Sequence, residues 1–421
     1  MGGGLLQLVA YGAQDVYLTG NPQITFFKVV YRRHTTFAIE AIAQTFNGTP
    51  AYGNRVTCQI SRNGDLIHRM YLSLLMPTTG TFCAGYGLRL IDNVEIEIGG
   101  QKIDKHYSHW LYIWNELSLP KAKRDGYNKM VGMSGGTTQL QSKTLYIPLE
   151  FWFCRNVGLA LPLIALQYHE VKLNIQFETG TNCSGTDTAL SEFPTATLWV
   201  DYIFLDTDER RRFAQLSHEY LIEQLQFTGS ESVTAGTKMN PKLTFNHPCK
   251  ELVWFIRKTT TAATATQRNN NWFNYTTQNS RIGTGVAALP YLYNVNEHTL
   301  RTSATTTDAA LPANMVTKAK LTLNGNERFS ERSGAYFNLV QPFQHHENVP
   351  SNAGINVYSF ALKPEEHQPS GTLNMSRIDT ATLNLEYNTV DPSDTAILNV
   401  YAVNYNVLRI LSGMGGLAYS N

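Results

Sequence analysis

Two short clusters in the 421-residue sequence place imidazole beside carboxylate, a pairing used in acid–base and metal chemistry. They are His169-Glu170 and His345-His346-Glu347. Neither cluster has two histidines at the i, i+4 spacing of a metal-binding helix, and neither has a third ligand at metal spacing. The sequence therefore predicts histidines that are solvated or hydrogen-bonded within the fold, without a metal site.

Glu95 and Glu97 alternate along one expected strand face, which is a pattern that could place a pair of carboxylates for glycoside chemistry. Adjacent outward positions of an ordinary half-exposed strand explain the same pattern. The sequence also has no phosphate-binding loop and no dinucleotide fingerprint. We therefore expect no catalytic residue, no bound cofactor and no metal ligand in this chain.

Acidic and basic residues are nearly balanced, with 34 Lys and Arg against 33 Asp and Glu. The run Arg210, Arg211 and Arg212 could meet an anionic partner, but it follows acidic residues and is typical of a solvated linker with local ion pairs. A balanced chain has no charge excess to drive bulk binding to nucleic acid or to an anionic membrane. We therefore expect no direct genome binding.

The cysteines are odd in number and scattered, with no C-x-x-C pair and no zinc spacing. They are Cys58, Cys83, Cys154, Cys183 and Cys249. We expect free buried thiols in a reducing compartment. The longest apolar run, residues 159–166, is far shorter than the roughly 20 residues of a membrane span, and the N-terminus lacks the basic region of a signal peptide. These features predict synthesis in the cytosol.

The elements that must position these residues form an internal repeat. Three strand patterns recur in the same order: VKLNIQF (171–177) with ATLNLEY (381–387), VEIEIGGQKID (94–104) with AKLTLNGNERF (319–329), and TLWVDYIFLD (197–206) with ILNVYAVNYN (397–406). Apolar residues alternate in each, which indicates strands with one buried face. With 22 Tyr and 19 Phe, the composition also favours strands. The chain is therefore expected to be all-β, with two copies of one domain joined at residues 198–224.

Strands are expected in the first half at residues 24–31, 55–60, 66–76 and 88–98, and two strands buried on both faces within residues 146–177. Residues 101–119 carry an i, i+3, i+4, i+7 apolar stripe that ends at Pro120, which predicts a short helix. The glycine-rich lead-in, residues 2–20, is too apolar to be left in water. We expect it to lie against the base of its own domain, a neighbouring subunit or an inner layer of an assembly.

A long stretch rich in Thr, Ala and Asn occupies residues 258–318 of the second half. Loops longer than about 15 residues are uncommon unless they are functional or disordered, so we expect a surface loop here. Asn274-Tyr275-Thr276 within it is an acceptor pattern for N-glycans, and similar triplets begin at Asn47, Asn182 and Asn374. Asn274 is the candidate glycan attachment site, although cytosolic synthesis would deny it the usual machinery.

Six long blocks carry a resemblance that runs from end to end: residues 10–35, 60–67, 159–173, 199–206, 218–231 and 405–419. Among them are AYGAQDVYLTGNPQITFFKVVYRRHT, LALPLIALQYHEVKL and YNVLRILSGMGGLAY. The blocks resemble the major capsid proteins of nucleocytoplasmic large DNA viruses, of the chlorella-virus type.

The resemblance implies an all-β fold of two tandem eight-stranded antiparallel jelly rolls, a double jelly roll, with short helical insertions. The expected organisation is an N-terminal base segment at residues 1–23, a first jelly roll at 24–212 and a second at 213–421. In that family three chains form one pseudo-hexagonal capsomer. The chain is therefore expected to be a homotrimer whose capsomers tile the icosahedral shell of a large DNA virus.

The same resemblance implies a structural protein without catalysis, found in the virion capsid after synthesis and assembly in the host cytoplasm. Its expected partners are neighbouring capsomers, minor capsid proteins beneath the shell and the inner viral membrane surface, which the N-terminal segment would face. An alternative from a different class is a two-domain β-sandwich protein that binds or cleaves glycans, because fold alone does not exclude it.

Overall fold

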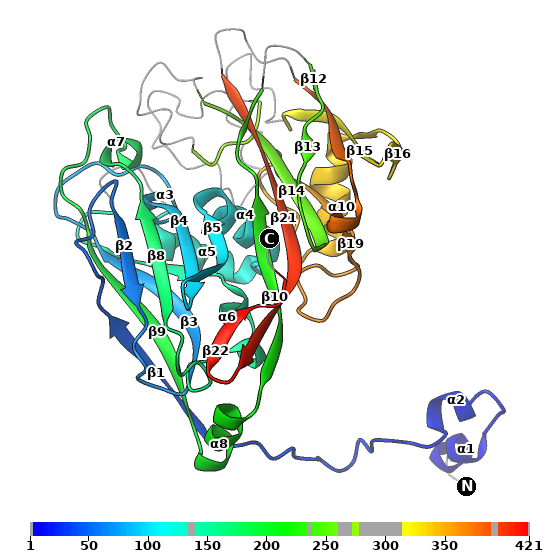
Figure 1. The fold of residues 1–421 in the computed structure, drawn as a ribbon. Coiled ribbons are helices and arrows are strands. Elements are labelled where there is room, and N and C mark those ends of the chain that lie inside the picture. Colours follow the sequence, from blue (N-terminus) through cyan, green and yellow to red (C-terminus); the bar gives the residue numbers. More distant parts are fainter. Residues whose placement is uncertain are drawn as a thin grey trace. The chain divides into compact units, whose positions relative to one another are not determined.

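The computed structural model describes residues 3–133, 140–233, 237–259, 272–277, 314–388 and 395–419 (Figure 1). The chain divides into two compact units, Met1–Thr36 and Phe37–Asn421. The first unit contains two short helices, α1 (Gly3–Val9) and α2 (Val16–Thr19).

The expected strand at residues 24–31 does not form. Among the described residues, no strand pairs with this stretch, and its side chains are exposed. An isolated strand would leave its backbone N–H and C=O groups without ladder partners, so apolar composition alone does not produce one. The first strand begins at Phe37 instead.

The second unit starts with two antiparallel sheets, whose main strands follow the orders β1-β9-β3-β6 and β2-β8-β4-β5 (Figure 1). These strands are β1 (Phe37–Gln44), β2 (Arg55–Gln59), β3 (Leu66–Leu75), β4 (Ile91–Ile98), β5 (Gln101–Tyr107), β6 (Thr144–Leu149), β8 (Val171–Phe177) and β9 (Thr195–Leu205), with the short β7 (Leu161–Pro162) beside β3. The chain passes back and forth between the two sheets in the order of a jelly roll. We call this part the first roll.

Two further sheets repeat this order as β10-β21-β14-β18 and β12-β20-β15-β16. Their strands are β10 (His218–Phe227), β12 (Lys238–Met239), β13 (Lys242–Leu243), β14 (Pro248–Lys258), β15 (Val316–Leu323), β16 (Asn326–Glu327), β18 (Asn356–Ser359), β20 (Ala381–Tyr387) and β21 (Ala396–Leu411). Short strands flank them: β11 (Glu231–Val233), β17 (Arg332–Ser333), β19 (Leu373–Asn374) and β22 (Met414–Leu417). We call this part the second roll.

The three sequence repeats occupy equivalent places in the two rolls. β8 and β20 each lie second in their sheet. β9 lies between β1 and β3, and β21 lies between β10 and β14 in the same way. β4 turns into β5 through Gly99-Gly100, and β15 turns into β16 through Asn324-Gly325, all four with positive φ. Two-residue hairpins need this backbone conformation, which explains the glycine in both copies. The double jelly roll inferred from the sequence is confirmed.

Helices interrupt both rolls and connect one roll to the other. They are α3 (Tyr86–Leu90), α4 (Ser108–Ser118), α5 (Lys121–Val131), α6 (Trp152–Arg155), η1 (Val157–Leu159), α7 (Gly180–Cys183), α8 (Thr207–Gln215), η2 (Tyr336–Val340), α10 (Gln341–His345) and η3 (Met375–Arg377). The helix expected at 101–119 begins only at Ser108, because the residues before it pair with β4 as β5. α6 and η1 likewise lie within the stretch 146–177, and β6 alternates between buried and exposed residues rather than being buried on both faces.

The joint between the rolls is a helix. Asp206 N-caps α8, and its side chain accepts a hydrogen bond from the Thr207 backbone N–H at 2.8 Å. Acidic residues fill the first turn of α8 and Arg212 lies in its last turn, which suits the helix dipole. The charged sequence at the joint therefore reflects a solvated helix between two apolar strands.

Two large apolar clusters fill the second unit. One contains the core of the first roll and extends to Val253, Phe255 and Tyr401 of the second roll, whereas the other lies within the second roll. The neighbours Trp254 and Val400 point into that second cluster. β14 and β21 are thus buried on both faces, one against their own roll and one against the first roll.

Candidate functional site

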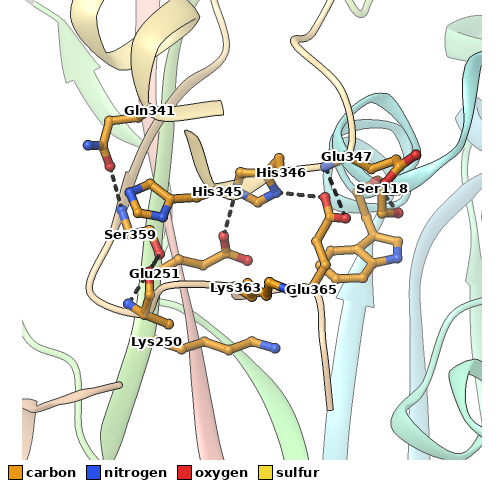
Figure 2. Close-up of polar contacts among 12 residues, drawn as sticks. Ser118, Lys250, Glu251, Gln341, His345, His346, Glu347, Ser359, Lys363 and Glu365 are labelled. Carbon is orange, nitrogen blue, oxygen red and sulfur yellow. Dashed lines mark hydrogen bonds and ion pairs between the residues drawn. The ribbon is translucent and has the colours of Figure 1, made fainter. Parts of the chain in front are cut away.

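His346 lies in a row of buried charges (Figure 2). Its Nε2 is 3.1 Å from an Oε of Glu251 in β14, and its Nδ1 is 2.7 Å from Oε1 of Glu365. Burial opposes a charged imidazole, but the two carboxylates outweigh this effect and raise the pKa of His346 to about 9. Burial likewise acts to raise the pKa of Glu251, but His346 and Lys250 overcome it and hold that pKa below its usual value. The histidine is bonded within the fold as predicted, and its two carboxylate partners favour the charged imidazole at neutral pH.

A second set of charges joins the rolls. Glu223 of β10 pairs with buried Lys250 of β14 (Oε1–Nζ 2.7 Å) and with Arg155 of α6 (Oε2–Nη1 3.0 Å). The Arg155 guanidinium also lies 3.8 Å from the ring centroid of Trp114. Removing one partner of such a buried set leaves an uncompensated charge, so these contacts fix the pairing of the two rolls.

Polar contacts extend this junction along β5 and α4. The backbone N–H of Leu225 donates to Oδ1 of Asp104 at 3.0 Å, and the Gln224 side chain donates to the Ile103 carbonyl. Ser351 donates to Oε2 of Glu116 through both its backbone N–H (3.1 Å) and its hydroxyl (2.8 Å). The first roll therefore meets the second through a sheet edge and a helical insertion.

Residues 272–277 form a buried segment inside the range expected to be a surface loop. Trp272 receives two guanidinium groups over its ring, Arg89 at 3.2 Å and Arg257 at 3.9 Å. Tyr275 is fully buried, its ring is stacked 4.0 Å from that of Phe255, and its hydroxyl is 2.9 Å from Nδ1 of His109. The expectation of a surface loop at 258–318 is wrong for these residues, because their aromatic rings fill the junction between the rolls.

Asn274 lies in this segment. Its Oδ1 accepts hydrogen bonds from the backbone N–H (3.1 Å) and hydroxyl (2.8 Å) of Thr276, which is buried. Attachment of a glycan would thus have to precede the burial of Thr276. The glycan at Asn274 stays a prediction.

The remaining sequence candidates are bonded within the fold. Glu95 pairs with Arg55 at 2.8 Å, and the Asn174 side chain donates to Glu97 at 3.2 Å. Nδ1 of His169 is 2.8 Å from the Gly415 carbonyl. His169 and Glu170 line an open cavity of about 350 Å³. Within the described part of the chain, no three His, Cys, Asp or Glu side chains are grouped as metal ligands.

Arg210 pairs with Asp65 of the first roll at 2.9 Å, so its ion pair is long-range in sequence rather than local to the linker as expected. All five cysteines are free and buried, as the sequence predicts, whereas the reducing compartment stays a prediction. Burial raises the pKa of Cys58 to about 11 and that of Cys83 to about 12, so both thiols are poor nucleophiles. Over the residues that the structure describes, no helix has the length and apolar character needed to cross a bilayer.

Comparison with known proteins agrees with this architecture. The model of the large eukaryotic DNA virus major capsid protein matches residues 209–416, and that of the major capsid protein N-terminus matches residues 25–206. The major capsid proteins of Pyramimonas orientalis virus and Paramecium bursaria Chlorella virus 1 are 53% and 48% identical, each over the full length of both chains.

Solved structures show the same fold. A structure described as PBCV-1 VP54 has a TM-score of 0.75 and 43% identity, covering 94% of this chain and 100% of that chain. The Faustovirus major capsid protein has a TM-score of 0.73 at 14% identity, covering 95% and 94%, and shows the fold alone. Two jelly rolls in one chain, joined by a buried charged and aromatic junction, define the class of double-jelly-roll proteins. The chain belongs to the family of large eukaryotic DNA virus major capsid proteins. The alternative of a glycan-binding or glycan-cleaving protein has no support.

Proposed function

We propose that three copies of this chain form a pseudo-hexagonal capsomer, and that these capsomers tile the icosahedral shell of a large DNA virus. The repeated strand order of the two rolls carries this proposal. Each chain supplies two similar units, so three chains supply six around one axis. The role is structural and without catalysis, because the candidate histidines and carboxylates described above serve contacts within the fold.

Neighbouring capsomers would be the lateral partners in the shell. Minor capsid proteins and the inner viral membrane surface would lie beneath it, facing the N-terminal segment. Apolar side chains of this segment that are exposed in the single chain support such a partner: Leu5, Leu6, Leu8, Val9, Tyr11, Val16 and Tyr17. Synthesis and assembly would take place in the host cytoplasm, which suits a chain with five free thiols.

Sedimentation of the purified chain tests the capsomer. We expect a single species with three times the chain mass at micromolar concentration. A stable, folded monomer at that concentration would contradict the proposal.

A further inference from the structure

The junction between the two rolls joins two different kinds of surface. The first roll contributes α4, a helical insertion between β5 and β6. The second roll contributes the outer face of its sheet β10-β21-β14-β18, where Tyr401 lies 5.7 Å from Trp110 and Phe255 lies 5.1 Å from His109 (ring centroids). A helical insertion of one roll thus covers the sheet face of the other.

Each roll carries both kinds of surface, and the junction uses only one from each. The second roll has its own helical insertion, η2 and α10, at the equivalent position between β16 and β18. This insertion exposes apolar side chains, and Phe343 is 77% exposed. Leu362 adjoins them, because its carbonyl is 2.9 Å from Nδ1 of His345. We call Leu339, Val340, Phe343 and Leu362 the helical patch.

The first roll has the equivalent sheet face. In β3 and β9, Leu72 pairs with Leu198 toward the core, and the next pair, Tyr71 and Trp199, points outward. The same register in the second roll pairs Ile256 with Leu398 toward the core and Phe255 with Asn399 outward. Tyr71 therefore occupies the position of Phe255, which the junction covers.

Aromatic side chains gather at this place. Tyr71 is stacked on Trp199 with ring centroids 6.4 Å apart, and Tyr146 of β6 meets Tyr71 edge-on at 6.0 Å. Tyr146 is 42% exposed and Leu75, at the end of β3, is 51% exposed. We call Tyr71, Leu75, Tyr146 and Trp199 the aromatic face.

We propose that the helical patch of one chain docks on the aromatic face of a second copy, and that this contact repeats around the capsomer. The inference rests on the proposed trimer and assigns its interface. The chain itself shows that a helical insertion fits this face, because α4 already covers the equivalent one in the second roll. The contact is head-to-tail, and such contacts generate closed rings when the rotation between copies closes.

Two single variants test the two sides separately. Phe343→Asp places a charge in the helical patch, and Tyr146→Asp places one on the aromatic face. Both side chains are exposed in the single chain, so each variant should still fold and should unfold cooperatively on heating as a monomer. We expect the concentration at which trimers dissociate to rise on the order of 100-fold, as for a central interface residue. Leu216→Asp, an exposed apolar position in neither surface, is the matched control.

Mixing the two variants tests the head-to-tail geometry. The Tyr146→Asp chain keeps an intact helical patch and the Phe343→Asp chain keeps an intact aromatic face. A mixture should therefore form a dimer of one chain of each kind, seen by native mass spectrometry, whereas neither variant should dimerise alone.

The outcomes separate this inference from the capsomer proposal. A monomeric wild type defeats the capsomer. Trimeric wild type with both variants equally trimeric, or a mixture that stays monomeric, overturns the assigned interface and leaves the capsomer standing. If the variants trimerise normally but fail to assemble shells, the two surfaces bind a partner outside the trimer. That outcome would also overturn the assigned interface.

Discussion

The His346 ring lies between two carboxylates, and this position gives the folded protein a positive charge that the unfolded chain lacks at mildly alkaline pH. Glu251 comes from β14, and Glu365 follows β18. The three side chains therefore tie the helical insertion of the second roll to its sheet (Figure 2). Their stabilising effect depends on the proton that His346 holds.

Stability should fall as pH rises through this range. The pKa of His346 rises from an ordinary value of 6.5 to about 9 in the folded chain, so the contribution is complete below about pH 6.5 and is lost as pH approaches 9. We expect a loss on the order of 3 kcal/mol in the free energy of unfolding across this window. Urea denaturation at a series of pH values measures it.

His346→Gln is the control for this titration, because glutamine keeps hydrogen bonding without a titrating group. The variant should show a flatter pH dependence between about 6.5 and 9. Equal slopes in the two proteins would show that His346 does not titrate as described.

At the scale of elements, the segment 272–277 behaves as part of the core. Thr276 forms a β-bridge with Asn314, so the chain leaves this segment and returns beside it. Phe273 and Tyr275 are buried against α4 and β14. The residues between 277 and 314 lie outside the described part of the chain, and the bridge joins the described residues on either side of them.

This geometry divides the long loop into removable and essential parts. Replacing residues 278–312 by a short glycine-serine linker should leave the folded body intact, because the bridge already holds the ends together and closure entropy grows slowly with length. Deleting residues 260–306 should instead abolish soluble protein, because it removes Phe273 and Tyr275. Soluble yield and thermal unfolding compare the two. Equal behaviour would show that the buried aromatic segment contributes little.

At the scale of the whole molecule, folding and assembly use different parts of the chain. Phe37–Asn421 holds all the described strands, and Met1–Thr36 is a separate unit without any. The helices of the smaller unit expose their apolar side chains, and Leu8 is 80% exposed. Burying such surface contributes about 25 cal/mol per Å², so a partner that covers the segment would gain several kcal/mol.

Removing residues 1–20 should therefore leave the trimer intact and prevent shell assembly. Sedimentation reports the trimer, and electron microscopy of assembled material reports the shell. A substitution that keeps the length but replaces Leu5, Leu6 and Leu8 by serine separates the apolar contact from chain length. Failure of the truncated chain to trimerise would place the segment in the subunit interface, and normal shells would show that assembly does not need it.

The sequence by itself determined the repeated architecture, because its evidence is local. Alternating residues in 171–177 and 381–387 specify strands with one buried face, and Gly100 and Gly325 specify two-residue turns. The same local rule gave a wrong prediction at residues 24–31, where the apolar run forms no strand because no described strand pairs with it. The family followed from long matching blocks for the same reason, since they preserve local sequence.

Only the tertiary structure decided which faces are covered and which charges meet. Alternation shows that Tyr71 and Phe255 each leave their own core, but not that α4 and Tyr275 cover Phe255 while Tyr71 is half-buried beside Trp199 and Tyr146. His346 and Glu251 are far apart in sequence, so no spacing could pair them. Burial and charge pairing depend on which distant elements pack together, and that is settled by the packing of the two rolls.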